Sequence, residues 1–143
     1  MKTPKRVLFL CVHNSARSIL AEFLVNHFWR DQFAAQSAGL EAARVNPNAI
    51  RALGEIGIEA ASARSKSIEE FRGAQFDLVV PVCAPSEGAC PVWIGAGKRA
   101  HLPFEDPSRA AGTDAETLAR FRATRDEMRE RLLDFLQTQF VVE

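Results

Sequence analysis

The chain has 143 residues and a mass of 15.8 kDa, which suffices for one globular domain with one hydrophobic core, so we expect a single domain over residues 1–143. Hydrophobic residues make up 47% and charged residues 25% of the chain, a balance typical of soluble proteins that excludes disorder and fibrous repeats. The 18 basic and 18 acidic residues cancel, so no overall field favours nucleic acid or a membrane surface, and any anion site must be local.

Cysteine usage indicates where the protein works. The chain has three cysteines, and this odd and low number makes a secreted disulfide framework a poor explanation. The apolar stretch Val7–Val12 is far shorter than a membrane span or a signal-peptide core. We therefore expect a cytoplasmic protein without membrane attachment.

The first half of the chain alternates between strand and helix patterns. The run from Arg6 to Cys11 is apolar after its first residue, which is typical of a strand buried on both faces. Leu20, Leu24 and Phe28 recur at helical spacing. The predicted elements are a strand at 6–11, a helix from about residue 16, a strand at 34–38, and a helix from Pro47 to Gly57.

The second half continues the alternation and ends in a long helix. Ser67 and Glu70 have capping-box spacing, and so do Thr113 and Glu116. The predicted elements are a short helix after residue 67, a strand at 76–82, a loop at 84–97, a strand at 99–104 and a helix from residue 113. The apolar stripe of that last helix is Leu118, Phe121, Met128, Leu132 and Phe135.

This order predicts an α/β fold: a single doubly wound domain with a central four-stranded parallel sheet and helices on both faces. In such a fold the functional loops lie at the carboxyl ends of the strands. Cys11 and Cys83 both fall at such ends.

The segment from Cys11 to Ser18 has the composition of an oxyanion site. A loop that enters a helix presents backbone N–H groups to an anion, and an Arg17 fork can close over it. The positive helix end favours the thiolate form of Cys11, with Ser18 as a further donor. The alternative is a core cysteine with a surface arginine. The predicted oxyanion loop is Val12, His13, Asn14, Ser15, Ala16, Arg17 and Ser18.

Cys83 and Cys90 flank residues 84–89, where Pro85 and Gly88 disfavour regular structure. They are either two unrelated core residues or a redox pair, and their position beside a strand end favours the redox pair. Three cysteines without a nearby histidine make a poor tetrahedral set, so we expect no metal and no cofactor.

Cys11–Ser18 resembles the phosphate-binding loop of the low-molecular-weight protein tyrosine phosphatase superfamily, and Asp106-Pro107 resembles its general acid. Within that superfamily, residues 76–80 and 83–91 resemble the thioredoxin-coupled arsenate reductases. Residues 37–39 and 45–47 match as well, so the resemblance covers nearly the whole chain.

The resemblance implies a reduction of arsenate to arsenite. Cys11 would attack arsenic while Arg17 holds the oxygens and Asp106 protonates the departing oxygen. Cys83 would then attack the Cys11 adduct, and Cys90 would attack Cys83, moving the disulfide outward for thioredoxin to reduce. Phosphate and sulfate would compete for the same loop. The sequence leaves glutathione or mycothiol open as the reductant, and it leaves the role of His13 open.

The chain departs from the family pattern at three places. Ala16 stands where a further cysteine is common, and Leu102-Pro103 replaces an aromatic-glycine pair. A potassium site that some relatives form would match Asn14, Glu22 and Ser37, but Lys66 stands in place of its aspartate. We therefore expect the Lys66 ammonium to pair with Glu22 and potassium not to stimulate the protein.

Two other functions use part of the same set. A tyrosine phosphatase or small-ester phosphatase would employ Cys11, Arg17 and Asp106, but the chain has no tyrosine to line an aromatic cleft. A cysteine phosphocarrier domain of a sugar transport system would also place a cysteine after the first strand, yet it would need neither Arg17 nor Asp106.

Overall fold

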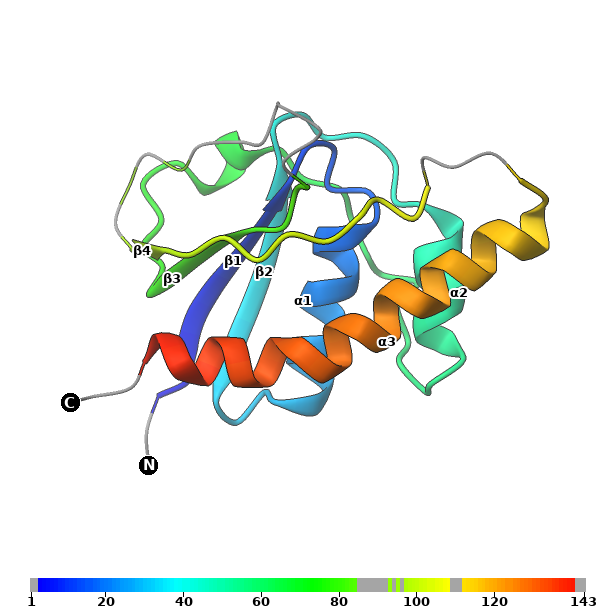
Figure 1. Ribbon diagram of the computed structural model, residues 1–143. Helices are drawn as coiled ribbons and strands as arrows, with labels where there is room; N and C mark the ends of the chain where they lie inside the picture. The colour runs from blue at the N-terminus through cyan, green and yellow to red at the C-terminus, as the bar shows by residue number, and fades with distance from the viewer. Residues whose placement is uncertain (1–2, 85–92, 94, 96, 109–111, 141–143) are drawn as a thin grey trace.

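The computed structural model describes residues 3–84, 93, 95, 97–108 and 112–140 (Figure 1). Within these residues the strands form one parallel sheet in the order β2-β1-β3-β4, which confirms the predicted α/β class. The elements are β1 (Lys5–Cys11), α1 (Arg17–Phe28), β2 (Phe33–Gly39), α2 (Pro47–Gly54), the 3-10 helix η1 (Ile68–Phe71), β3 (Leu78–Pro81), β4 (Lys98–Arg99) and α3 (Asp114–Gln139).

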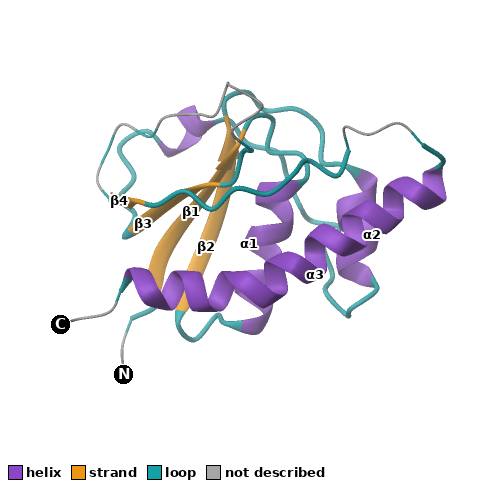
Figure 2. Cartoon of the chain, in the orientation of Figure 1, coloured by secondary structure: helices purple, strands orange, loops and turns teal. Residues whose placement is uncertain are grey.

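The direction of winding reverses next to β1, which lies between β2 and β3 in the sheet (Figure 2). β1 pairs with β2 along its whole length, from Lys5 opposite Phe33 to Cys11 opposite Gly39. The chain then returns past β1 to form β3 on its other side. In doubly wound sheets, ligands bind at the carboxyl ends of the two strands where the winding reverses. Here those two strands are β1, which ends at Cys11, and β3, which Cys83 follows.

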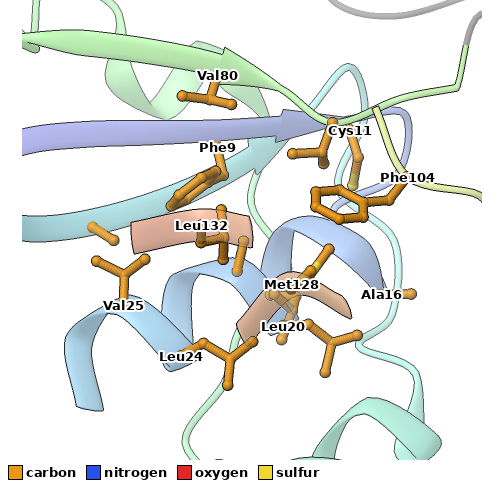
Figure 3. Close-up of a cluster of buried hydrophobic side chains, with 14 of the residues drawn as sticks. Phe9, Cys11, Ala16, Leu20, Leu24, Val25, Val80, Phe104, Met128 and Leu132 are labelled. Atoms are coloured by element: carbon orange, nitrogen blue, oxygen red, sulfur yellow. The ribbon is translucent and has the colours of Figure 1, made fainter. Parts of the chain in front are cut away.

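The two faces of the sheet are covered differently. Val7 and Phe9 of β1 face the large core cluster, which the buried sides of α1, α2 and α3 complete. Figure 3 shows part of this cluster, with Cys11 at its end near Phe104. On the opposite face, Leu8 and Leu10 pack in a smaller cluster against Phe76 and Trp93, with Ile68 and Phe71 of η1 beside them. Because β1 is buried on both sides, the position of Cys11 is tightly fixed.

The last strand is shorter than predicted, and Pro81 is the reason. Ala100, Leu102 and Phe104 donate their N–H groups to the carbonyl oxygens of Val79, Pro81 and Val82, so residues 100–104 follow the sheet edge. Pro81 has no N–H group to donate in return, which interrupts the ladder after Arg99. The predicted strand at 99–104 is therefore an extended segment bonded to β3 and to the residue after it.

Other boundaries differ from the prediction as well, and β3 covers only Leu78–Pro81 of the predicted strand at 76–82. α2 ends at Gly54 instead of Gly57, and Gly57 has a φ of 84° in the turn that follows. The Ser67 hydroxyl accepts from the Glu69 N–H group, but the Glu70 carboxylate pairs with Arg64, so no capping box closes and the turn is a 3-10 helix. At α3, by contrast, the Thr113 cap and its capping box are confirmed. No helix among the described residues is long and apolar enough to span a membrane.

Candidate active site

The loop between β1 and α1 forms the floor of a small cavity. The N-terminus of α1 follows Ala16 and has no side-chain cap, so no side chain occupies its first N–H groups. A cavity of about 50 Å³ opens above this helix end, which carries the positive end of the helix dipole. Its lining residues are Cys11, His13, Ser15, Ala16, Arg17, Asp106 and Ser108. The space suits a small anion.

Arg17 is held in the wall of this cavity. Its side chain is only 4% exposed, and Nη1 donates to the carbonyl oxygen of Phe104 at 3.0 Å. Nη2 lies 3.7 Å from Oδ2 of Asp106. Burial and the hydrogen bond to Phe104 hold the guanidinium at the cavity, where it can receive the oxygens of an anion.

Asp106 is oriented by Ser108. Oδ1 of Asp106 accepts from both the N–H group and the hydroxyl of Ser108, at 2.9 and 2.7 Å. The other oxygen, Oδ2, is the one nearer Arg17. Because Ser108 occupies Oδ1, Oδ2 is the oxygen that can carry a proton toward a group bound at Arg17. Ser108 is not among the predicted site residues, although an aspartate in a turn commonly accepts from the N–H group two residues further on.

A chain of hydrogen bonds directs a donor at the Cys11 sulfur. The Lys66 N–H group donates to Oδ1 of Asn14 at 2.7 Å, which fixes the side-chain amide, and Nδ2 of Asn14 donates to Oγ of Ser18 at 2.8 Å. Oγ of Ser18 lies 2.8 Å from Sγ of Cys11. Since Asn14 donates to Ser18, the Ser18 proton is free to point at the sulfur and to hold the Cys11 side chain in one orientation.

The backbone of the loop depends on a glycine in the neighbouring strand. Asn14 has a φ of 50°, the left-handed region that asparagine tolerates. Gly39 lies so close that a Cβ atom there would stand 2.7 Å from the nitrogen of Asn14 and 2.9 Å from the carbonyl oxygen of Val12. Only glycine therefore allows β2 and the loop to approach each other.

Behind the loop lies a small ionic cluster. Nζ of Lys66 is 3.6 Å from Oε1 of Glu22 and donates to the carbonyl oxygen of Arg64 at 2.9 Å. The Ser37 hydroxyl donates to the same Glu22 oxygen. Burial raises the pKa of Glu22, while the Ser37 hydrogen bond and the Lys66 charge act to lower it. The ammonium thus lies among the residues of the predicted cation site and pairs with Glu22, as expected.

Cys83 lies at the end of the strand next to Cys11. Its side chain is buried, and its Sγ is 4.0 Å from the carbonyl oxygen of Leu10. Cys83 is disulfide-bonded, whereas Cys11 is free, so that disulfide does not join the two. Cys90, the third predicted thiol, lies outside the described residues. The structure therefore brings Cys11, Arg17 and Asp106 together around one cavity and places Cys83 beside the same strand end.

Comparisons with known proteins show the family of the chain. Residues 6–140 match the model of the low molecular weight phosphotyrosine protein phosphatase family. An arsenate reductase of Halalkalibacterium halodurans and one of Bacillus subtilis are each 40% identical over 134 residues, which is 94% of this chain and 96% of theirs. A solved arsenate reductase in the phosphate binding state has a TM-score of 0.71 and 30% identity, and the match covers 94% of this chain and 98% of that one.

The fold and the site define a protein of the phosphatase type, with a cysteine and an arginine around a small cavity at the loop between β1 and α1. The chain belongs to the low molecular weight phosphotyrosine protein phosphatase family, in the group that contains the arsenate reductases.

Proposed function

We propose that the protein reduces arsenate to arsenite in the cytoplasm, with Cys11 as the nucleophile and a relay through Cys83 and Cys90 that thioredoxin resets. The observation that carries this proposal is the placement of Cys83 at the carboxyl end of the strand adjacent to Cys11. A phosphatase needs one thiol at this edge, whereas a two-electron reduction needs two thiols.

In the first step the Cys11 thiolate attacks arsenic. An S–As bond forms, and one arsenate oxygen leaves as water after Asp106 has supplied a proton. Arg17 and the N–H groups at the start of α1 neutralise the remaining oxygens, which is the role that their burial and orientation support. The hydrogen bond with Ser18 orients the Cys11 sulfur for the attack.

In the second step Cys83 forms a disulfide with Cys11 and displaces arsenic. Its thiolate attacks the Cys11 sulfur, an S–S bond forms, the S–As bond breaks, and the electron pair of that bond stays on arsenic. Two thiols are thereby oxidised to a disulfide and arsenic(V) is reduced to arsenic(III). The balance over both steps is arsenic acid plus two thiols giving arsenous acid, a disulfide and water.

In the third step Cys90 attacks Cys83 and releases Cys11. The relay then ends with Cys11 free and Cys83 in a disulfide, and the states of Cys11 and Cys83 in the structure are compatible with this end point. The loop rich in proline and glycine between the two cysteines supports their approach to each other. Thioredoxin would then reduce the outer disulfide.

The experiment is a coupled assay that follows arsenate-dependent oxidation of NADPH with thioredoxin and thioredoxin reductase. The wild-type protein should turn over repeatedly, and Cys11→Ser, Cys83→Ser and Cys90→Ser should each stop turnover. Sustained turnover by any one of these variants would contradict the relay.

Ester hydrolysis is the activity that the same pocket supports without the relay, because it needs only Cys11, Arg17 and Asp106. We propose a weak side activity on an artificial phosphate ester. Cys83→Ser should abolish arsenate turnover and leave this hydrolysis intact, whereas equal loss of both activities would contradict the separate roles.

We further propose that the Lys66 ammonium replaces a bound potassium ion. Its position beside Glu22 supports this, since a second cation there would meet like charge. Exchange of sodium for potassium at constant ionic strength should leave the rate of arsenate reduction unchanged, and a clear rise would refute the proposal.

A further inference from the structure

A histidine holds the main chain of Cys83. Nε2 of His101 lies 2.7 Å from the carbonyl oxygen of Cys83. A carbonyl oxygen can only accept, so the ring nitrogen is the donor. The bond joins residues that are 18 positions apart, and it fixes the residue that carries the second thiol.

His101 belongs to the segment 101–104, which contacts both the residues that precede Cys83 and Arg17. Leu102 and Phe104, on either side of Pro103, donate to the carbonyl oxygens of Pro81 and Val82, and their side chains are buried. The carbonyl oxygen of Phe104 accepts from Arg17, which lines the anion cavity. The segment 101–104 is thus anchored beside β3 and at the arginine, and His101 extends this anchoring to Cys83.

We propose that His101 is a positioning residue for the second thiol: its hydrogen bond keeps the main chain of Cys83 beside the end of β1, within reach of Cys11. The inference rests on the proposed relay and adds a residue to it. Because the bond is made to a main-chain oxygen, it is independent of the partner that the Cys83 sulfur holds. Cys83 can then change disulfide partners by rotation of its side chain while its backbone stays in place.

This role predicts an effect on one chemical step. Without the hydrogen bond, the Cys83 backbone samples positions away from β1, and attack on the Cys11 adduct becomes slower. The first step uses Cys11, Arg17 and Asp106, and none of these contacts His101 in the hydrogen bonds and ion pairs described above. The net free energy of one hydrogen bond corresponds to a roughly three- to tenfold lower rate of this attack.

The test uses single-turnover reactions of the reduced protein with arsenate in a Cys90→Ser background, which stops the relay at the Cys11–Cys83 disulfide. Rapid quenching with an alkylating agent and intact mass measurement give the rate of disulfide formation. Hydrolysis of para-nitrophenyl phosphate reports on the first step. The variants are His101→Ala, His101→Gln, whose amide can donate from a similar position, and His27→Ala as a matched control.

His101→Ala should slow disulfide formation about three- to tenfold, and His101→Gln should restore most of the rate. Ester hydrolysis should stay within about twofold of the wild type in all variants. An unchanged disulfide rate in His101→Ala, a parallel loss of ester hydrolysis, or a glutamine variant as slow as the alanine variant would overturn the inference. If the background protein itself forms no Cys11–Cys83 disulfide, the relay fails, and the role of His101 fails with it.

Discussion

Replacing Ser18 by alanine removes the hydroxyl that lies 2.8 Å from the Cys11 sulfur. Ser18 is fully buried, and Asn14 donates to its oxygen, so the hydroxyl proton is directed at the sulfur. The net contribution of one hydrogen bond is about 0.5–1.5 kcal/mol. The Ser18→Ala variant should therefore hydrolyse para-nitrophenyl phosphate roughly three- to tenfold more slowly than the wild type, because the attacking sulfur is no longer held in one orientation.

The loss should fall on kcat and leave the KM for the ester within about twofold. Ser18 contacts the sulfur, whereas the cavity is lined by other residues, among them Arg17 and Asp106. Initial rates over a range of ester concentrations separate the two constants.

The assay requires that Cys11 is the only thiol, so both proteins carry Cys83→Ser and Cys90→Ser. Ser62→Ala, a substitution of the same kind at an exposed turn residue, serves as the matched control. A kcat of Ser18→Ala that coincides with that of the control, or a loss that appears only in KM, would refute the hydrogen-bond chain as the arrangement that orients the sulfur.

Three further substitutions test other parts of the structure. Gly39→Ala should lower ester hydrolysis and arsenate reduction together, because the added Cβ meets the backbone of the anion loop at Asn14, and equal activity would contradict this. The Arg122 hydrogen bond is the main reason that the pKa of Glu55 is lowered to about 2. The Glu55 carboxylate therefore stabilises the fold at pH values above its ordinary pKa. This stabilisation is lost as the pH falls through the lowered pKa. Glu55→Gln should therefore lower the thermal midpoint at neutral pH, and the difference from wild type should shrink toward about pH 2. Arg17→Lys should raise the KM for arsenate at least about tenfold, because a lysine cannot make the forked contact; an unchanged KM would show that the loop amides suffice.

The order of strands and helices was predictable because it follows from the local spacing of apolar residues. The apolar run into Cys11 and the helical spacing after Ala16 place a thiol at a strand end and an arginine at a helix start. The structure keeps both positions, with β1 ending at Cys11 and α1 beginning at Arg17. Short motifs that join a strand to a helix are local, so a single sequence carries most of their information.

The features that could not be predicted depend on contacts between residues far apart in the sequence. The end of β4 follows from the missing N–H group of Pro81, which matters only once that proline lies opposite the segment after Arg99. The contact of His101 with Cys83 bridges two segments in the same way. The Lys66 pair with Glu22 was predictable only through the resemblance to a family, since no local pattern links residues so far apart.

In the most direct measurement, fully reduced protein is mixed with excess arsenate without any external reductant. The arsenite formed and the thiols that remain are then quantified. If electrons pass from sulfur to arsenic as proposed, each chain should release one arsenite and lose two thiols, and Cys11→Ser should do neither. Arsenate that stays unreduced, or arsenite that forms with all three thiols intact, would contradict the account.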